Sequence, residues 1–184
     1  MHGLISLLDT QHYAKVESLW YALRDECGLK DVYVTPLPHF SWQVAKDYDW
    51  DALEGVLQSI AAEVKPFSIQ TGGLALFTGE KPVVYIPVVR TAELSQIQKM
   101  IWERLASVSI GVCQYYAPSL WMPHISLAYS DVTPETLKCI MGRLAFQTYN
   151  WAIEVDNITL IYEPEGAIGM VKYRFDFSGK ESAP

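Results

Sequence analysis

Apolar positions along the chain switch repeatedly between the spacing of β-strands and the spacing of α-helices. Apolar or alternating runs typical of strands occur at residues 4–8, 39–44, 67–70, 83–89 and 124–129, and further strands are expected around residues 152–162 and 170–177. Apolar residues that recur every three or four positions predict helices within residues 13–23, 53–64, 94–105 and 137–144. The pattern therefore predicts an α+β protein.

Residues that start and stop helices stand at the expected boundaries. Asp9 or Thr10 can cap the first predicted helix, and Gly28 is suited to end it. Thr91 can cap the third helix, and Thr133, which is followed by a proline, can cap the fourth. These signals support the helix assignments independently of the apolar pattern.

The order of elements repeats. Residues 1–80 and residues 81–177 each read strand, helix, strand, helix, strand. We therefore predict a single bilobal domain over residues 1–177 in which these two repeats form lobes related by a pseudo-twofold axis. The polar residues 178–184 are expected to form a flexible tail.

Composition restricts the class of protein. The chain has 184 residues, of which 50% are apolar and 19% are charged, so a folded core is expected and disorder, collagen and coiled coil are excluded. The net charge of -7 opposes binding to long DNA, long RNA or an anionic membrane. A small anionic ligand or the end of a nucleic acid remains compatible with this charge.

Cysteine and histidine positions give no sign of a disulfide framework or a metal site. Cys27, Cys113 and Cys139 are odd in number and far apart, so we expect reduced thiols and a cytoplasmic protein without a metal. His2 is expected to lie in a disordered terminus and His12 on a solvated helix face. The stretch 105–130 lacks charged residues, but prolines and serines interrupt it, so we interpret it as buried wall and strand rather than a membrane span.

A pentapeptide of the form Pro-His-apolar-Ser-apolar occurs twice. The first copy holds His39 and Ser41, and the second holds His124 and Ser126, each on a predicted strand. Alternation along a strand places the histidine and the serine on one face and the apolar residues, such as Trp42, on the other. A single histidine on a strand is most often structural, but core packing gives no reason to repeat the same polar pair.

Two imidazoles and two hydroxyls suit the cleavage of a phosphodiester. This reaction requires one group that takes a proton from the attacking water and another that supplies a proton to the departing oxygen, and imidazole can do either near neutral pH. The Ser41 and Ser126 hydroxyls can donate hydrogen bonds to the non-bridging phosphate oxygens without a metal ion. We therefore predict that the two motifs meet around one phosphorus atom.

The paired motifs resemble those of the two-histidine (2H) phosphoesterase superfamily, especially its RNA 2',3'-cyclic phosphodiesterase and 2'-5' RNA ligase-like branch. The resemblance covers most of the chain and implies two antiparallel sheets flanked by helices, with a central cleft. It also implies that His39 and His124 form the acid–base pair and that Ser41 and Ser126 bind the phosphate. Many members have threonine at the serine positions, and RNA-end enzymes often have an arginine where this chain has Ala128 and Tyr129.

The implied activity is metal-independent hydrolysis of a 2',3'-cyclic phosphate, on an RNA end or a nucleotide, to a 2'-phosphate, with no cofactor. The sequence does not show which histidine is the acid, and two alternatives stay open: a 2'-5' RNA ligase or related phosphodiesterase, and a catalytically silent nucleotide-binding module. Tyr115, Tyr116 and Trp121 precede the second motif and are candidates for stacking on a base. A monomer is expected.

Overall fold

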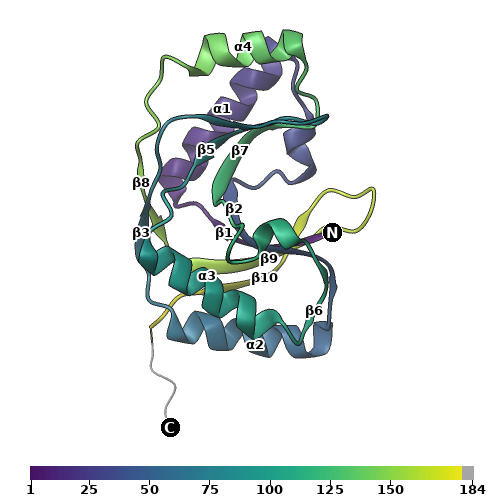
Figure 1. The fold of residues 1–184 in the computed structure, drawn as a ribbon, viewed down its shortest axis with the longest axis vertical. Helices are drawn as coiled ribbons and strands as arrows, with labels where there is room; N and C mark the ends of the chain where they lie inside the picture. Colours follow the sequence, from purple (N-terminus) through teal and green to yellow (C-terminus); the bar gives the residue numbers. More distant parts are fainter. Residues whose placement is uncertain (180–184) are drawn as a thin grey trace.

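The computed structural model describes residues 1–179 and confirms the predicted α+β class (Figure 1). The order of elements is β1 (His2–Leu7), α1 (Thr10–Cys27), the 3-10 turn η1 (Asp31–Val34), β2 (His39–Tyr48), α2 (Trp50–Glu63), β3 (Phe67–Gln70), β4 (Ala75–Phe77), β5 (Val83–Pro87), α3 (Ala92–Leu105), β6 (Ser109–Val112), the 3-10 turn η2 (Gln114–Tyr116), β7 (His124–Tyr129), α4 (Pro134–Leu144), β8 (Ala152–Val155), β9 (Asn157–Tyr162) and β10 (Met170–Asp176). β4, β6 and the two 3-10 turns have no counterpart among the predicted elements.

Helix ends follow the predicted capping residues. The Asp9 carboxylate accepts a hydrogen bond from the backbone N–H of His12, which makes Asp9 rather than Thr10 the N-cap of α1. Gly28 ends that helix in the left-handed conformation, with φ at 77°, which glycine adopts without steric cost. Thr91 and Thr133 cap α3 and α4 in the same way as Asp9 caps α1.

The strands form one five-stranded sheet and a second, more irregular group. The larger sheet has the order β10-β9-β1-β2-β6, and all of its pairs are antiparallel. In the second group β4, β5 and β7 pair, β3 pairs with β8, and an isolated bridge between Thr71 and Val88 links the end of β3 to the end of β5. β3 matches the predicted strand at 67–70, and Gly72 and Gly73, the latter with a φ of 70°, separate it from β4.

Both halves of the sequence contribute to every sheet. The five-stranded sheet combines β1 and β2 with β6, β9 and β10, while β3 and β4 pair with strands of the second half. The predicted repeats, residues 1–80 and 81–177, are therefore interleaved in space instead of each forming its own lobe. The opening unit of each repeat is still recognisable, because β1 pairs with β2 and β5 pairs with β7, with α1 and α3 in the respective connections.

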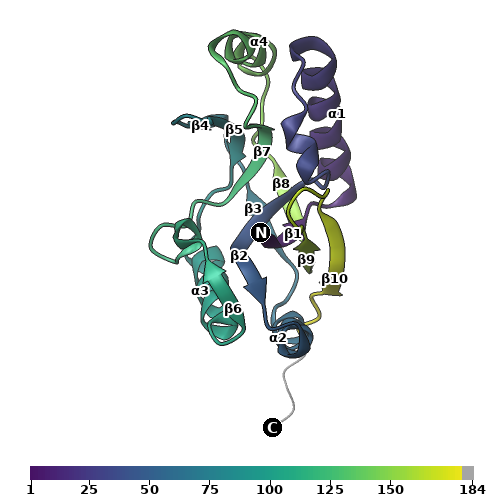
Figure 2. The ribbon, with the colours of Figure 1, turned by 90° about the vertical axis from the view of Figure 1, so that its right-hand side faces the viewer.

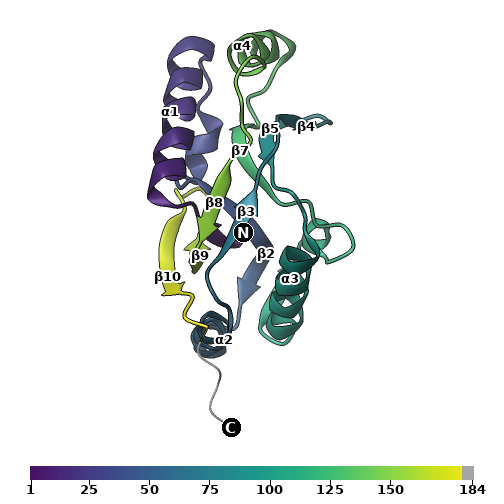
Figure 3. The ribbon, with the colours of Figure 1, turned by 90° about the vertical axis from the view of Figure 1, so that its left-hand side faces the viewer.

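The helices form two pairs at opposite ends of the molecule. α1 contacts α4 at one end, and α2 contacts α3 at the other (Figures 2 and 3). α1 also packs on β7, and α3 packs on β2, so the first helix of each repeat covers the motif strand of the other repeat. No helix within residues 1–179 is long and apolar enough to cross a membrane.

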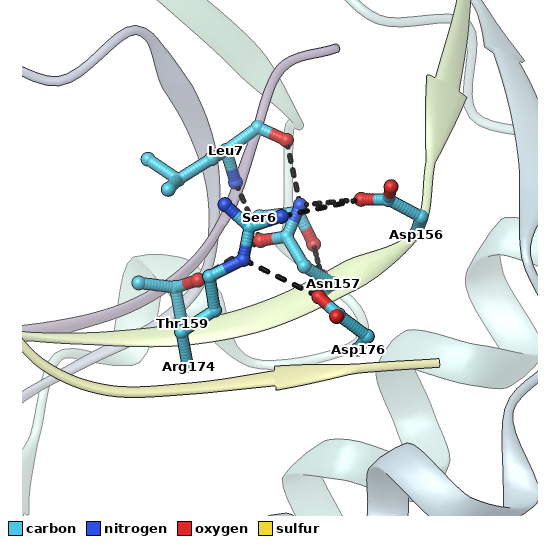
Figure 4. A network of polar contacts seen from close by, with 7 residues as sticks. All are labelled: Ser6, Leu7, Asp156, Asn157, Thr159, Arg174 and Asp176. Atoms are coloured by element: carbon cyan, nitrogen blue, oxygen red, sulfur yellow. Dashed lines mark hydrogen bonds and ion pairs between the residues drawn. The ribbon is translucent and has the colours of Figure 1, made fainter. Parts of the chain in front are cut away.

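A buried polar network ties the motif strand β2 to β1 and β9. The Asn157 side chain accepts from the Leu7 N–H and donates to the Leu7 carbonyl, both at 3.0 Å (Figure 4). The Ser6 hydroxyl donates to the backbone carbonyl of Asn157, and the indole N–H of Trp42 donates to the Ser6 hydroxyl at 2.8 Å. The network thus reaches the residue that follows Ser41.

Three expectations about isolated residues are wrong. Cys27 and Cys139 form a disulfide that joins α1 to α4, although reduced thiols were predicted, and Cys113 is free. His2 lies in β1, where it is 7% exposed and stacks on Tyr162. His12 is 6% exposed because its ring bonds to Asp9 and packs on Trp151, instead of facing solvent.

The end of the described chain is held against α2. Ser178 donates its backbone N–H to the carbonyl of Ala61, and Gly179 donates to that of Val64. Of the predicted flexible tail 178–184, these first two residues therefore have fixed partners. Residues 180–184 lie outside the described part of the chain.

Candidate active site

Each motif begins at a buried proline that fixes the start of its strand. The carbonyl of Pro38 accepts from the Leu8 N–H at 3.2 Å, and the carbonyl of Pro123 accepts from the Val88 N–H at 3.0 Å. Proline has no N–H, so the first backbone N–H that β2 or β7 can donate to a partner strand is that of the histidine that follows. His39 and His124 are accordingly the first residues of their strands.

The two motif strands share an irregularity. The register between β1 and β2 shifts directly after Ser41, and the register between β5 and β7 shifts directly after Ser126. One residue is left over in each case, which is the mark of a β-bulge. The motifs therefore correspond in strand geometry as well as in sequence.

The polar residues of each motif share one face, as alternation predicts. His39, Ser41, His124 and Ser126 are all partly exposed. The intervening apolar residues are 0% exposed and belong to the core: Phe40, Trp42, Ile125 and Leu127.

The motif strands meet, although they belong to different sheets. β2 and β7 are in contact near the middle of the molecule (Figure 2). Burial is the main cause that lowers the pKa of His39, and the positive charge of protonated His124 acts in the same direction. Two strands whose histidines are 85 positions apart in the sequence are thus in contact.

Both histidines use the same ring nitrogen to bond the backbone. Nδ1 of His39 donates to the carbonyl of Leu37, and Nδ1 of His124 donates to the carbonyl of Met122 at 2.7 Å. A carbonyl oxygen only accepts, so Nδ1 carries the hydrogen in both rings. In the neutral form Nε2 is therefore the basic nitrogen, and in the protonated form Nε2 carries the proton that can be transferred.

The surroundings of both rings disfavour the charged form. Burial lowers the pKa of His39 to about 4, the charge of His124 acts in the same direction, and the hydrogen bond to Leu37 opposes it. Burial also lowers the pKa of His124, against the hydrogen bond to Met122. At neutral pH and without an anion nearby, His39 is thus held in the neutral form that a general base requires.

The backbone carbonyl of each serine accepts a hydrogen bond from a tryptophan indole. Nε1 of Trp121 donates to the carbonyl of Ser41 at 2.9 Å, and Nε1 of Trp20 donates to the carbonyl of Ser126 at 3.0 Å. Both indoles lie in the core, with exposures of 1% for Trp121 and 3% for Trp20. These contacts cross between the repeats, because each tryptophan comes from the half that does not contain its serine.

The three aromatic residues predicted to stack on a base lie in different environments. The Trp121 ring stacks on Trp42 with 5.5 Å between centroids, so its buried position argues against the predicted contact with substrate. Tyr115 is 80% exposed. Tyr116 is partly buried, and burial raises the pKa of its hydroxyl to about 12.

Residues 1–179 contain no cluster of three or more histidine, cysteine, aspartate or glutamate side chains that could hold a metal ion. The polar side chains of the two motifs are two imidazoles and two serine hydroxyls. Such a set can move protons and donate hydrogen bonds to an anion.

Comparison with known proteins identifies the family. A sequence model of the 2'-5' RNA ligase superfamily matches residues 9–167, which include both motifs. The chain belongs to the 2'-5' RNA ligase superfamily. This agrees with the two-histidine phosphoesterase assignment suggested by the motifs. The findings support an enzyme of this superfamily.

Relatives and solved structures agree with the superfamily assignment. A protein of Oceanobacillus iheyensis named "Putative phosphoesterase" is 25% identical over 129 residues, which are 68% of this chain and 71% of that protein. A protein of Bacillus mycoides with the same description is 22% identical over 82% of this chain and 84% of its own length.

Two crystal structures share the fold of this superfamily member. TT0787 of Thermus thermophilus matches with a TM-score of 0.66 at 17% identity, over 98% of this chain and 99% of that one. E. coli LigT, solved in complex with ATP, matches with a TM-score of 0.51 at 14% identity, over 97% of this chain and 99% of that one. At these identities the likeness establishes the fold alone.

Several residues around the site of this superfamily member were not foreseen from the sequence. Phe77 and Tyr85 flank His124, with ring centroids 4.9 and 5.0 Å from that of the imidazole. The Arg90 guanidinium donates to the carbonyls of Trp121 and Pro118 and thereby holds the loop that leads into the second motif. No pattern in the sequence pointed to Phe77 or Trp20, because both reach the site only through tertiary contacts.

Proposed function

We propose that the protein is a metal-independent phosphodiesterase that hydrolyses a 2',3'-cyclic phosphate, on a nucleotide or an RNA end, to a 2'-phosphate. One observation carries the proposal. The two histidines are duplicated in sequence, register and backbone hydrogen bonding, and both carry a hydrogen on Nδ1, which leaves both Nε2 atoms available for proton transfer.

The roles proposed for the histidines follow from their pKa values. His39, with a pKa of about 4, is neutral over the working range, so its Nε2 takes a proton from the attacking water. The water oxygen forms a bond to phosphorus, the bond from phosphorus to the 3' oxygen breaks, and Nε2 of protonated His124 supplies a proton to that oxygen. The anionic substrate favours the protonated form of His124 because an opposite charge nearby raises the pKa of an imidazole.

The serine hydroxyls are proposed to bind the non-bridging oxygens of the phosphate. Ser41 and Ser126 lie on the same strand faces as the histidines, two residues further along each strand. As negative charge develops on the non-bridging oxygens, preorganised donors stabilise the transition state more than the ground state. Removal of one such donor costs about 100-fold to 1,000-fold in kcat.

The test is hydrolysis of nucleoside 2',3'-cyclic phosphates by the purified protein in excess EDTA, with the products identified by phosphorus NMR. We expect a 2'-phosphate product, and we expect His39→Ala and His124→Ala each to reduce turnover by about 100-fold or more. His12→Gln is the matched control, because the His12 ring bonds to Asp9 and packs on Trp151 and makes no hydrogen bond to either motif. Undiminished turnover in both motif variants would refute the proposal.

Two further substrates in the same assay separate the alternatives. A phosphodiesterase for 2'-5' linkages would cleave 2'-5' linked oligonucleotides and leave cyclic phosphates unchanged. A 2'-5' RNA ligase would consume a 2',3'-cyclic phosphate end only when an RNA with a free 5'-hydroxyl is present, and would join the two. A silent binding module would bind the nucleotides in a saturable manner and release no product. Any of these results would replace the proposed activity with the corresponding alternative.

A further inference from the structure

We propose that Trp20 and Trp121 are positioning residues that hold the two phosphate-binding serines in their working geometry. The inference rests on the proposed function, since it concerns the same serines. Its starting point is that two buried indoles, from unrelated places in the sequence, donate to the backbone carbonyls of two equivalent residues.

The carbonyls in question lie where the strands need additional support. The register of β2 and of β7 shifts immediately after the serine, so the inter-strand ladder is disrupted at that peptide. A carbonyl oxygen that is held by a fixed donor restricts rotation of the peptide plane that follows the serine. The direction of the serine Cα–Cβ bond, and with it the hydroxyl, is then restricted as well.

Both indoles are themselves firmly held. Trp121 stacks on Trp42, and the carbonyl of Trp121 accepts a hydrogen bond from Arg90. Trp20 lies within α1, is 3% exposed and contacts the edge of the Tyr33 ring. A donor that cannot move transmits its position to the acceptor.

Duplication alone does not explain the pair of contacts. Trp20 lies in α1 of the first repeat, whereas Trp121 lies in the loop three residues before His124. The residue three positions before His39 is Pro36, so the two tryptophans do not correspond to each other. The same type of hydrogen bond is thus made twice by tryptophans at positions in the sequence that do not correspond. A buried indole needs some acceptor, but packing does not require that acceptor to be the serine carbonyl in both cases.

The test is a pair of double-mutant cycles on kcat/KM for a nucleoside 2',3'-cyclic phosphate. Trp20→Phe and Trp121→Phe keep an aromatic ring and remove the indole donor, and we expect each to lower kcat/KM by about 10-fold to 100-fold, mainly through kcat, because small displacements of catalytic groups are costly. Trp151→Phe is the matched control, because within residues 1–179 its indole nitrogen makes no hydrogen bond and it lies next to His12.

The decisive outcome is the pattern of coupling. If Trp20 acts through Ser126, then Trp20→Phe has little further effect once Ser126→Ala is present, but keeps its full effect in the Ser41→Ala background. Trp121 should couple to Ser41 and not to Ser126. Equal effects in both serine backgrounds would show a general packing role and overturn the inference, as would Phe variants with unchanged kcat/KM.

A second measurement needs no variant and applies even if a Phe variant does not fold. Titration of the wild-type protein with adenosine 2'-monophosphate, followed by NMR of the indole N–H signals, should shift the signals of Trp20 and Trp121 and leave that of Trp151 in place. If the nucleotide binds and neither the Trp20 nor the Trp121 indole signal shifts, the inference is overturned. Unchanged activity of both Ser41→Ala and Ser126→Ala would instead refute the serine role in the proposed function. That result can be told apart from a failure of the present inference, because it is obtained without any tryptophan variant.

Discussion

At the scale of residues, the proposed chemistry depends on an imidazole whose Nδ1 donates to the carbonyl two residues earlier. It occurs at His39 and again at His124, and in both cases it fixes the tautomer and the plane of the ring. Burial then lowers the pKa of both, more strongly for His39. Two chemically identical units are thereby given different protonation behaviour, which the proposed acid–base mechanism requires.

The first prediction concerns the pH dependence of kcat/KM. We expect activity to rise through about pH 4 as His39 loses its proton, and to fall on the acid side of neutrality as free His124 loses its own, because its pKa lies below 6.5. In kcat the alkaline limb should move to higher pH, since the bound phosphate stabilises protonated His124. Steady-state kinetics over a pH series checks this, and a profile that is flat from about pH 4 to about pH 9 would contradict paired histidine catalysis.

The second prediction concerns acid stability. The pKa of His39 is about 4 in the folded state and 6.5 ordinarily, so between these values the unfolded state binds more protons and the free energy of unfolding falls as the pH falls. His39→Gln should flatten this dependence between pH 6.5 and about pH 4. Urea denaturation at several pH values measures it, and an unchanged slope in His39→Gln would assign the dependence to other groups.

At this scale, local patterns in the sequence single out repeated residues and give no signal for residues that act through tertiary contacts. The repeat points to His39, Ser41, His124 and Ser126, and the shared faces predicted for the motifs are confirmed. Trp20 could not be found in this way, because it reaches Ser126 across a helix–strand contact 106 residues away in sequence.

At the scale of elements, the strength of the local signal decided which predictions were confirmed. The four helices have capping residues and an apolar face, and all were found. β6 was missed because it has only four residues, includes Gly111 with a φ of 63°, and lies at the sheet edge. The prediction for His12 was wrong for a related reason, because the helix face of His12 is covered by Trp151, which is distant in sequence.

The third prediction tests the polar network that supports β2. Asn157 is 1% exposed, and its side chain satisfies both the N–H and the carbonyl of Leu7 as well as the hydroxyl of Thr159. Asn157→Ala leaves these buried groups without partners, and we expect the free energy of unfolding to fall by about 2–4 kcal/mol. Urea denaturation measures the change, with the exposed Asn150→Ala as a matched control. Equal stability of the two variants would show that the network contributes nothing.

At the scale of the whole molecule, the repeats are interleaved. The sequence predicted two related units, and β1-α1-β2 and β5-α3-β7 are indeed equivalent in register. It could not predict that β9 and β10 complete the sheet of the first unit, since local patterns do not specify which strands pair. β2 and β7 come from different units and sheets, so their contact is a property of the complete fold.

The last prediction concerns the disulfide, the feature of the fold that the sequence pattern argued against. Cys27 ends α1 and Cys139 lies in α4, and the bond between them closes a loop with a sequence separation of 112. A cross-link over about 100 residues removes much of the entropy of the unfolded chain and typically stabilises a protein by about 2–4 kcal/mol. We expect Cys27→Ser, Cys139→Ser and the wild type in dithiothreitol to lose the same amount, because each removes the same bond.

The matched control for the disulfide is Cys113→Ser, which removes the free cysteine and should leave the free energy of unfolding unchanged with and without reductant. Thiol titration of the unfolded wild-type protein should find one free thiol before reduction and three after it. α1 and α4 also contact each other directly, so the two helices should stay packed when the disulfide is reduced, and unfolding should remain a single transition. Three free thiols before reduction would contradict the disulfide and agree instead with the reduced thiols predicted from the cysteine spacing.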